Sequence, residues 1–216
     1  MPFCSGGSGG AIVSVVVWVA DVGSVSAGNF AWCRMESEGV VTSGPDIAAL
    51  ATGVAADLSV GRQVALGFEC PLYVPVAREP RALSRARKVD GNRPWSAGPG
   101  CAVLALGLAE TAWVFSRLAE ITTVPVLPTF RWKELMAGRA NLFIWEAFVT
   151  GGAKGDSHEE DAVIAAASFW QRYPDIEEAV GQPDENPLSL AGAALLHSGL
   201  SDDVTLLSEA CVVIRS

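Results

Sequence analysis

The chain has 216 residues, and half of them are hydrophobic. It carries 15 Lys and Arg against 24 Asp and Glu, a formal net charge of −9. This composition suits one folded domain with a full hydrophobic core and excludes a disordered chain. An acidic chain is also a poor overall match to a polyanion such as duplex nucleic acid, so duplex binding is expected to be weak. The five cysteines are odd in number and include no C-x-x-C, which argues against a disulfide framework or structural zinc and favours a reducing cytoplasm.

The first ten residues, MPFCSGGSGG, predict a flexible leader that lacks the basic region of a secretory signal. Residues 11–21, AIVSVVVWVAD, are a β-branched apolar run without alternation, which is typical of a central strand buried on both faces. The run ends in Asp21, and α/β sheets place their sites beyond the carboxyl ends of strands. Asp21 is therefore a candidate site residue, although an Asp that simply opens a turn would look the same.

Two short strands, 29–35 and 40–43, follow with tight connections and predict a three-stranded antiparallel meander. Residues 47–58 predict a helix rich in Ala and Leu. A second buried strand, 63–69, then ends in an acid, Glu69, and the Cys-Pro sequence after it cannot extend the strand.

Residues 72–99 are rich in Pro and Arg without a periodic pattern, and they predict an insert. Residues 78–93 contain six basic residues and two acids, which gives this segment a local net charge of +4. We expect Arg87 and Arg93 to bind an anionic group of a substrate, with Asp90 orienting one of them. The alternative is a solvated Arg-rich loop.

The second half of the chain predicts an apolar helix at 100–121, for burial or a subunit interface, and a strand at 141–149 interrupted by Glu146. A helix follows from His158 to about residue 173, with capping-box spacing of Ser157 and Glu160. Residues from about 174 predict an acidic C-terminal extension. It includes a short helix at 188–197 and an apolar closing element at 204–214, for which the sequence does not decide between helix and strand. No apolar segment reaches membrane-spanning length without a charge or a Gly or Pro break, so no membrane association is expected.

The acids are expected to meet at one edge of the sheet. A right-handed crossover puts the first and fourth strands side by side, so Asp21 and Glu69 leave the sheet together. In the last long helix, His158 and Asp161 share one face. Such acids would repel one another unless a divalent cation neutralised them, which predicts a metal site of Asp21, Glu69 and Asp161, with Glu146 as a further ligand. Asp161 could instead serve only the helix dipole, and Glu69 could be an exposed strand end.

The pieces WVADVG, GFECPL, RKVDGNR, WEAFV and HEEDAVIAAA, together with the order of elements, resemble the RNase H-like fold. Over roughly residues 12–170 the chain is similar to the predicted-nuclease family catalogued as domain of unknown function 429. The resemblance implies a mixed α/β sheet, three antiparallel strands plus two parallel ones, flanked by helices. It also implies that Asp21, Glu69 and Asp161, with Glu146 as an additional ligand, bind Mg²⁺ or Mn²⁺ and hydrolyse a phosphodiester. His158, on the same helix face as Asp161, is expected to support the site. That family commonly has Asp where this chain has Glu69.

The expected function is thus metal-dependent hydrolysis of a small or single-stranded phosphodiester, in a protein that could form a homodimer. An actin-like phosphotransferase is a second reading of Asp21-Val22-Gly23, but such proteins need two domains. A Ser-His-Asp hydrolase is disfavoured because the chain has two histidines and no G-x-S-x-G sequence. The non-enzyme alternative is a module that binds an anionic ligand or assembles with other chains through its apolar helix.

Overall fold

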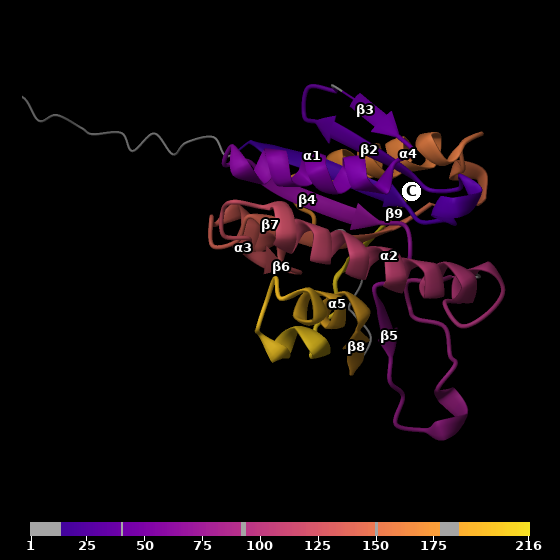
Figure 1. Cartoon of the computed structure of the whole chain (residues 1–216). Helices are drawn as coiled ribbons and strands as arrows, with labels where there is room; N and C mark the ends of the chain where they lie inside the picture. Colours follow the sequence, from indigo (N-terminus) through magenta and orange to yellow (C-terminus); the bar gives the residue numbers. More distant parts are fainter. Residues whose placement is uncertain (1–13, 40, 92–93, 150, 178–185) are drawn as a thin grey trace, which may run out of the picture.

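The strand β1 (Val15–Asp21) lies in the middle of a mixed sheet and is buried along its whole length (Figure 1). It pairs antiparallel with β2 (Ala31–Glu36), which pairs antiparallel with β3 (Val41–Gly44). On its other side β1 pairs parallel with β4 (Gln63–Phe68). The predicted meander and the adjacency of the first and fourth strands are confirmed. The computed structural model describes residues 14–39, 41–91, 94–149, 151–177 and 186–216, so the expected leader and Arg93 lie outside the described residues.

The other half of the sheet is parallel and is built on β7 (Leu142–Phe148), which lies beside β4. The short β6 (Pro128–Thr129) pairs with the start of β7, and β9 (Val212–Arg215) pairs with its end. The described sheet therefore has seven strands in the order β3-β2-β1-β4-β7-β6, with β9 also on β7. The C-terminal residues, expected as an extension, supply a strand of the main sheet. A hydrophobic run as short as β9 has too few residues for a period to identify its type.

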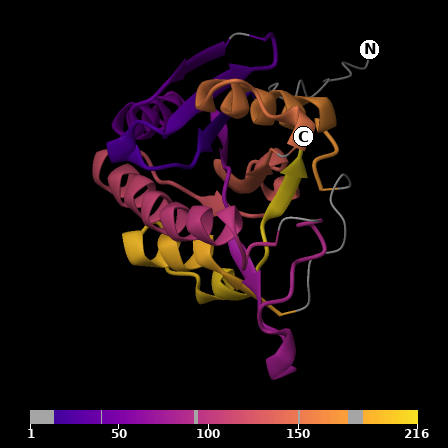
Figure 2. The same cartoon turned by 90° about the vertical axis from the view of Figure 1, so that its right-hand side faces the viewer.

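Helices cover both faces of the sheet, so its central strands β1, β4 and β7 have two buried sides (Figure 2). Along β1, Val16, Trp18 and Ala20 face the core formed with α1 (Ile47–Ser59), α2 (Pro99–Ile121) and α5 (Leu190–Ser198). The alternate residues Val15, Val17 and Val19 face α4 (His158–Arg172) and α3 (Trp132–Met136). This two-sided burial explains why the β1 sequence shows no polar alternation.

The helix α2 is apolar on both its buried and its exposed sides. Val114, Phe115 and Leu118 lie in the core, while Leu106 and Trp113 are exposed. Within the described parts of the chain, α2 is the one helix with the length and composition to cross a membrane, a test that core helices of soluble proteins also pass. The expected burial of this helix is thus found for one of its sides.

A second small sheet joins β5 (Tyr73–Pro75) to β8 (Pro187–Ser189). Beyond β5 the predicted insert projects away from the body of the protein and carries the 3-10 turn η2 (Pro80–Ala82) (Figure 1). Three further 3-10 turns are η1 (Val25–Ala27), η3 (Gly151–Ala153) and η4 (Val204–Ser208). The described part of the insert between β5 and α2, residues 76–91 and 94–98, is here called the arm. Its root is buried in the protein and its tip is exposed to solvent.

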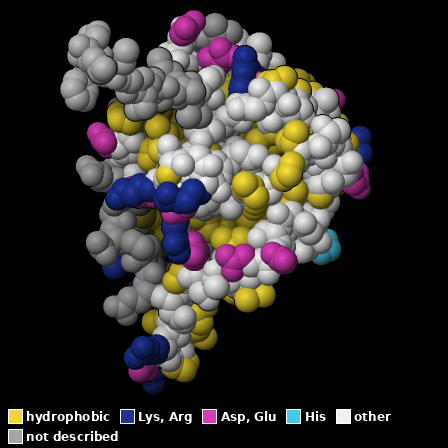
Figure 3. Space-filling view, turned by 90° about the vertical axis from the view of Figure 1, so that its left-hand side faces the viewer, with side chains coloured by type: hydrophobic (Ala, Val, Ile, Leu, Met, Phe, Trp, Pro, Cys, Tyr) yellow, Lys and Arg dark blue, Asp and Glu magenta, His cyan; other side chains and the backbone are white. Residues whose placement is uncertain are grey.

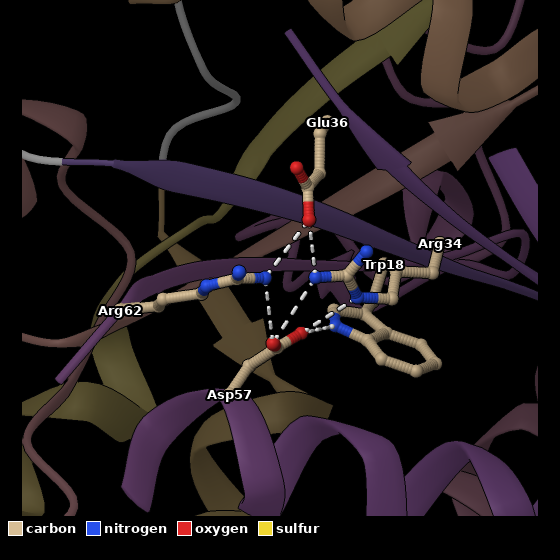
Figure 4. Close-up of polar contacts among 5 residues, drawn as sticks. All are labelled: Trp18, Arg34, Glu36, Asp57 and Arg62. Atoms are coloured by element: carbon tan, nitrogen blue, oxygen red, sulfur yellow. Dashed lines mark hydrogen bonds and ion pairs between the residues drawn. The ribbon is translucent and has the colours of Figure 1, made fainter. Parts of the chain in front are cut away.

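A charged network fastens α1 to the edge of the meander (Figure 4). The Asp57 carboxylate on α1 accepts hydrogen bonds from Trp18 Nε1 at 2.9 Å, from Arg34 Nε at 2.9 Å and from Arg62 Nη1 at 3.0 Å. Glu36 accepts from both arginines. The two guanidinium groups balance the two carboxylates, so the cluster is neutral and satisfied. Its role is to hold the helix on the sheet rather than to bind a ligand.

Candidate metal site

Three acids from three elements meet beyond the carboxyl ends of β1 and β4. Alternation along β1 puts Asp21 on the side of Val17 and Val19, which is the side that α4 covers. Glu69 follows directly on β4, and its N–H donates to Ala20 O at 2.8 Å, which holds it beside Asp21. Asp161 lies in the first turn of α4. One carboxylate oxygen from each of the three acids lies within 4.8 Å of the others.

The neighbours of the three acids, here called the acidic triad, fix their orientation. His158 Nδ1 lies 2.6 Å from Asp21 Oδ2. Gly155 N–H donates to Asp161 Oδ1 at 2.8 Å, and Lys154 Nζ donates to Asp161 Oδ2 at 3.0 Å. The contacts of Lys154 and Gly155 hold the segment that precedes α4 against Asp161. The helix itself is capped by Ser157, whose hydroxyl accepts from the Glu160 N–H. The expected sharing of one helix face by His158 and Asp161 is thus found, with both residues at the triad.

The electrostatics of the triad favour a bound cation. Burial raises the pKa of Asp21 above its usual range, although the hydrogen bond with His158 opposes this. Burial, and then the charge of Asp21, raise the pKa of Glu69 to about 9. Among the described residues, the buried Glu69 Oε2 finds no hydrogen-bond partner, and the Glu69 and Asp21 carboxyl groups can bond to each other only while one of them is protonated. A divalent cation would supply the missing partner and offset the repulsion between the carboxylates.

Lys154 is the triad neighbour that the sequence analysis missed as a site residue. Its Nζ lies 3.0 Å from Asp161 and 3.8 Å from Glu69, so a positive group already lies between two of the acids. Burial lowers the pKa of Lys154, but the charges of Glu69 and Asp161 outweigh burial and raise it, so the ammonium stays protonated. The available signal was a lone Lys in a glycine-rich segment seven residues before Asp161.

Glu110 is a second residue that the sequence analysis missed. It is buried on α2, and its Oε2 has no partner in the described structure. Burial, and then the charge of Asp21, raise its pKa to about 7. The signal for it was a single acid within the otherwise uncharged stretch 99–116. Its position puts one more carboxyl group near the triad, on the α2 side of the sheet.

The expectation that Glu146 joins the metal ligands does not fit the structure. Phe68 is its register partner in β4, and Phe68 faces the α2 side of the sheet. Side chains alternate along β4, so Glu69 faces the other side, towards α4. The carboxylate of Glu146 is fully buried and accepts from Arg87 Nη1 at 2.7 Å, Arg87 Nη2 at 2.6 Å and Leu72 N at 3.0 Å. Glu146 is therefore the ion-pair partner of Arg87, and its side chain lies on the opposite face of the sheet from the triad.

The expected substrate contact of Arg87 is corrected by the same geometry. Its side chain is 0% exposed, and all of its donor nitrogens point to protein acceptors. Asp90 does orient Arg87, as expected, through a 2.8 Å bond from Nε. Together with Glu146 they form a buried ion cluster at the root of the arm. Arg93, the other expected contact, lies outside the described residues.

Replacement of Glu69 by Gln is expected to stabilise the cation-free protein at pH 8. The folded-state pKa of Glu69, about 9, lies above the unfolded value of 4.5. The folded state therefore holds one more proton between these values, and the stability of the wild type falls as pH rises from about 4.5 to 9. Gln does not ionise and therefore removes that loss, which is expected to be at least about 1–2 kcal/mol at pH 8. Urea unfolding at pH 5 and pH 8, with a chelator present, measures the free energy of unfolding of the wild type and of Glu69→Gln. Glu38→Gln, at an exposed position, is the control. A difference between wild type and Glu69→Gln that does not grow with pH contradicts it.

The donor set of the triad suits a hard divalent cation. Each of its residues offers a carboxylate oxygen, the ligand type that Mg²⁺, Mn²⁺ and Ca²⁺ prefer, and no thiolate lies in the group. The buried triad of Asp21, Glu69 and Asp161 could therefore hold a metal ion. Comparison of the chain with protein-family models, with curated proteins and with solved structures finds no match.

Proposed function

We propose that this protein is a phosphodiester hydrolase that depends on Mg²⁺ or Mn²⁺ and acts on small or single-stranded substrates. The observation that carries the proposal is the convergence of Asp21, Glu69 and Asp161, from three separate elements, to within 4.8 Å. The buried, unpartnered oxygen of Glu69 supports it. The antiparallel meander followed by parallel strands, with acids at the strand ends, is also what an RNase H-like relationship would lead one to expect.

Each residue of the site has a separate task in this proposal. Asp21, Glu69 and Asp161 would hold the cation, which when bound supplies Lewis-acid polarisation of a phosphoryl oxygen and activation of water. His158 orients the Asp21 carboxylate, and the Gly155 N–H orients that of Asp161. Lys154, with a side chain 43% exposed, can turn from the acids towards an anionic oxygen of the substrate.

The charge distribution favours a small or single-stranded substrate over a duplex. A grip on a duplex needs a broad basic surface that neutralises many phosphates. The arm does carry exposed Arg78, Arg81 and Arg85, but the net charge of the whole chain is −9. Figure 3 shows the face at the opposite end of β4 from the triad, where the Lys and Arg side chains form separate groups with acidic side chains among them. Local contact with one or two phosphates fits this charge balance better than contact along a helix.

Hydrolysis of a small phosphodiester, such as bis(p-nitrophenyl) phosphate, tests the proposal. We expect Mn²⁺-dependent activity in the wild type and a loss of about 100-fold or more in Asp161→Asn, because the amide keeps the shape but removes the charge that a cation needs. Asp156→Asn, an exposed Asp in the same segment, is the matched control and should keep its activity. Full activity in a folded Asp161→Asn protein would exclude the metal mechanism.

A non-catalytic binding or assembly module is the second candidate, and the position of Lys154 favours it over a metal site. An ammonium group between Asp161 and Glu69 already neutralises part of the triad without a metal ion. In that case Lys154→Met should destabilise the protein and leave Mn²⁺ binding undetectable. In the hydrolase the same substitution frees two carboxylates and should tighten Mn²⁺ binding.

A further inference from the structure

A small cavity borders the acidic triad. Its volume is about 150 Å³, and its walls include both Glu69 and Lys154. Most of the remaining wall is apolar and comes from the arm, from the start of α2 and from the end of β7 (Trp95, Pro99, Val103, Phe148 and Val149). A cavity of about 150 Å³ is large enough for a benzene-sized ring, and it is smaller than the 300–1,000 Å³ of ordinary ligand pockets.

Two aromatic side chains in the wall are held in place before any ligand binds. Trp95 Nε1 donates to Arg85 O at 3.0 Å, and the Trp95 N–H donates to Asp90 Oδ2 at 3.1 Å, so both ends of this residue are tied to the arm. The guanidinium of Arg215 lies 5.2 Å from the ring centroid of Phe148. Rings that are already fixed lose little conformational entropy when another ring packs on them.

The cations that line the cavity are already paired with carboxylates. Arg87 and Asp90 both line it, but Arg87 is surrounded by Asp90 and Glu146, so two carboxylates face one guanidinium. The donors of Arg87 are already used by these partners and by Tyr73 O. Lys154 is likewise bonded to Asp161, so an anion would have to compete with carboxylates for these cations, whereas an uncharged aromatic ring would meet mainly apolar walls.

We propose that this cavity binds the nucleobase next to the phosphodiester that the triad holds. The inference rests on the proposed hydrolase function and narrows its substrate to nucleotide esters. Glu69 belongs to both the triad and the cavity wall, so a phosphoryl group at the triad would place its neighbouring base at the cavity. Stacking on fixed aromatic rings tolerates any base, because every base has a π-face. With Arg87 and Asp90 bonded to each other, little selectivity among bases is expected.

Adenosine binding to the cation-free protein tests the cavity separately from the chemistry. Calorimetry or NMR titration with a chelator should show saturable binding of adenosine and none of ribose. Trp95→Leu should weaken adenosine binding by about tenfold or more, because stacking of one base on an aromatic ring is worth about that much. Trp113→Leu removes an exposed tryptophan on α2 that does not line the cavity, and it should bind adenosine as the wild type does.

A second variant protects the test against misfolding of the first. Val103→Phe adds a ring to the cavity wall from α2 and should weaken adenosine binding without touching the arm. The proposal is overturned if the wild type binds no adenosine at millimolar concentration, if ribose binds equally well, or if a folded Trp95→Leu or Val103→Phe protein retains full affinity. Adenosine binding without Mn²⁺-dependent hydrolysis would support the base-binding cavity and contradict the proposed hydrolase function.

Discussion

Replacement of Arg87 by Met is expected to lower the free energy of unfolding by about 3–5 kcal/mol, because it leaves buried carboxylates without their cation. Glu146 loses its two bonds to the guanidinium, and Asp90 loses the bond from Nε. The side chains of Arg87 and Glu146 are both 0% exposed, so bulk solvent does not hydrate the carboxylate as it would at the surface. Chemical denaturation monitored by circular dichroism measures the loss.

A matched substitution and a double variant separate this ion cluster from the rest of the arm. Arg85→Met removes an exposed arginine two residues away and should change stability by less than about 0.5 kcal/mol. Adding Glu146→Leu to Arg87→Met should recover part of the loss, because the second substitution removes one of the unpaired charges. Equal stability of Arg87→Met and wild type would mean that the buried cluster does not hold the arm to the sheet.

Replacement of Asp21 by Asn is expected to weaken Mn²⁺ binding by about 100-fold or more. Groups that only orient metal ligands contribute about 10–100-fold, so a ligand itself should contribute at least the upper part of that range. His158→Gln, which changes the group that contacts Asp21 Oδ2 at 2.6 Å, should give a smaller loss of about tenfold. Titration calorimetry measures both. Glu160→Gln, beside Asp161 but outside the triad, should leave Mn²⁺ affinity unchanged.

Protons should leave the site when Mn²⁺ binds. The pKa of Glu69 is raised to about 9 by burial and by Asp21, so this residue is mainly protonated at pH 7 and must lose its proton to act as a ligand. Mn²⁺ affinity of the wild type should therefore increase from pH 6 to pH 9. A Mn²⁺ affinity that stays constant over this range would contradict the assignment of Glu69.

The sequence was enough to predict the sheet centre and the triad because both depend on local patterns and one handedness rule. The β-branched run before Asp21 and the run before Glu69 identify two buried strands, and the right-handed crossover makes them neighbours. The cap at Ser157 fixes the start of α4, which places Asp161 one turn into the helix. Each of these features is carried by adjacent residues, so no long-range contact had to be known.

The errors have the opposite origin, since they depend on contacts between distant residues. Glu146 and Glu69 both follow apolar strand residues, but the register between β4 and β7 decides which face each carboxylate meets. Arg87 lies in a basic segment that looks exposed, and only the contact with Glu146, 59 residues away, shows that it is buried. Lys154 reaches the triad through a turn whose shape its glycines do not specify.

The most direct test of the site is a crystal structure grown with Mn²⁺ and measured for anomalous scattering. The arrangement of Asp21, Glu69 and Asp161 predicts an anomalous peak between the three carboxylates, at about 2.0–2.3 Å from at least one oxygen of each, with Lys154 turned away. A structure at high Mn²⁺ concentration in which Lys154 Nζ still bridges Asp161 and Glu69, with no anomalous peak between the acids, would contradict the metal site.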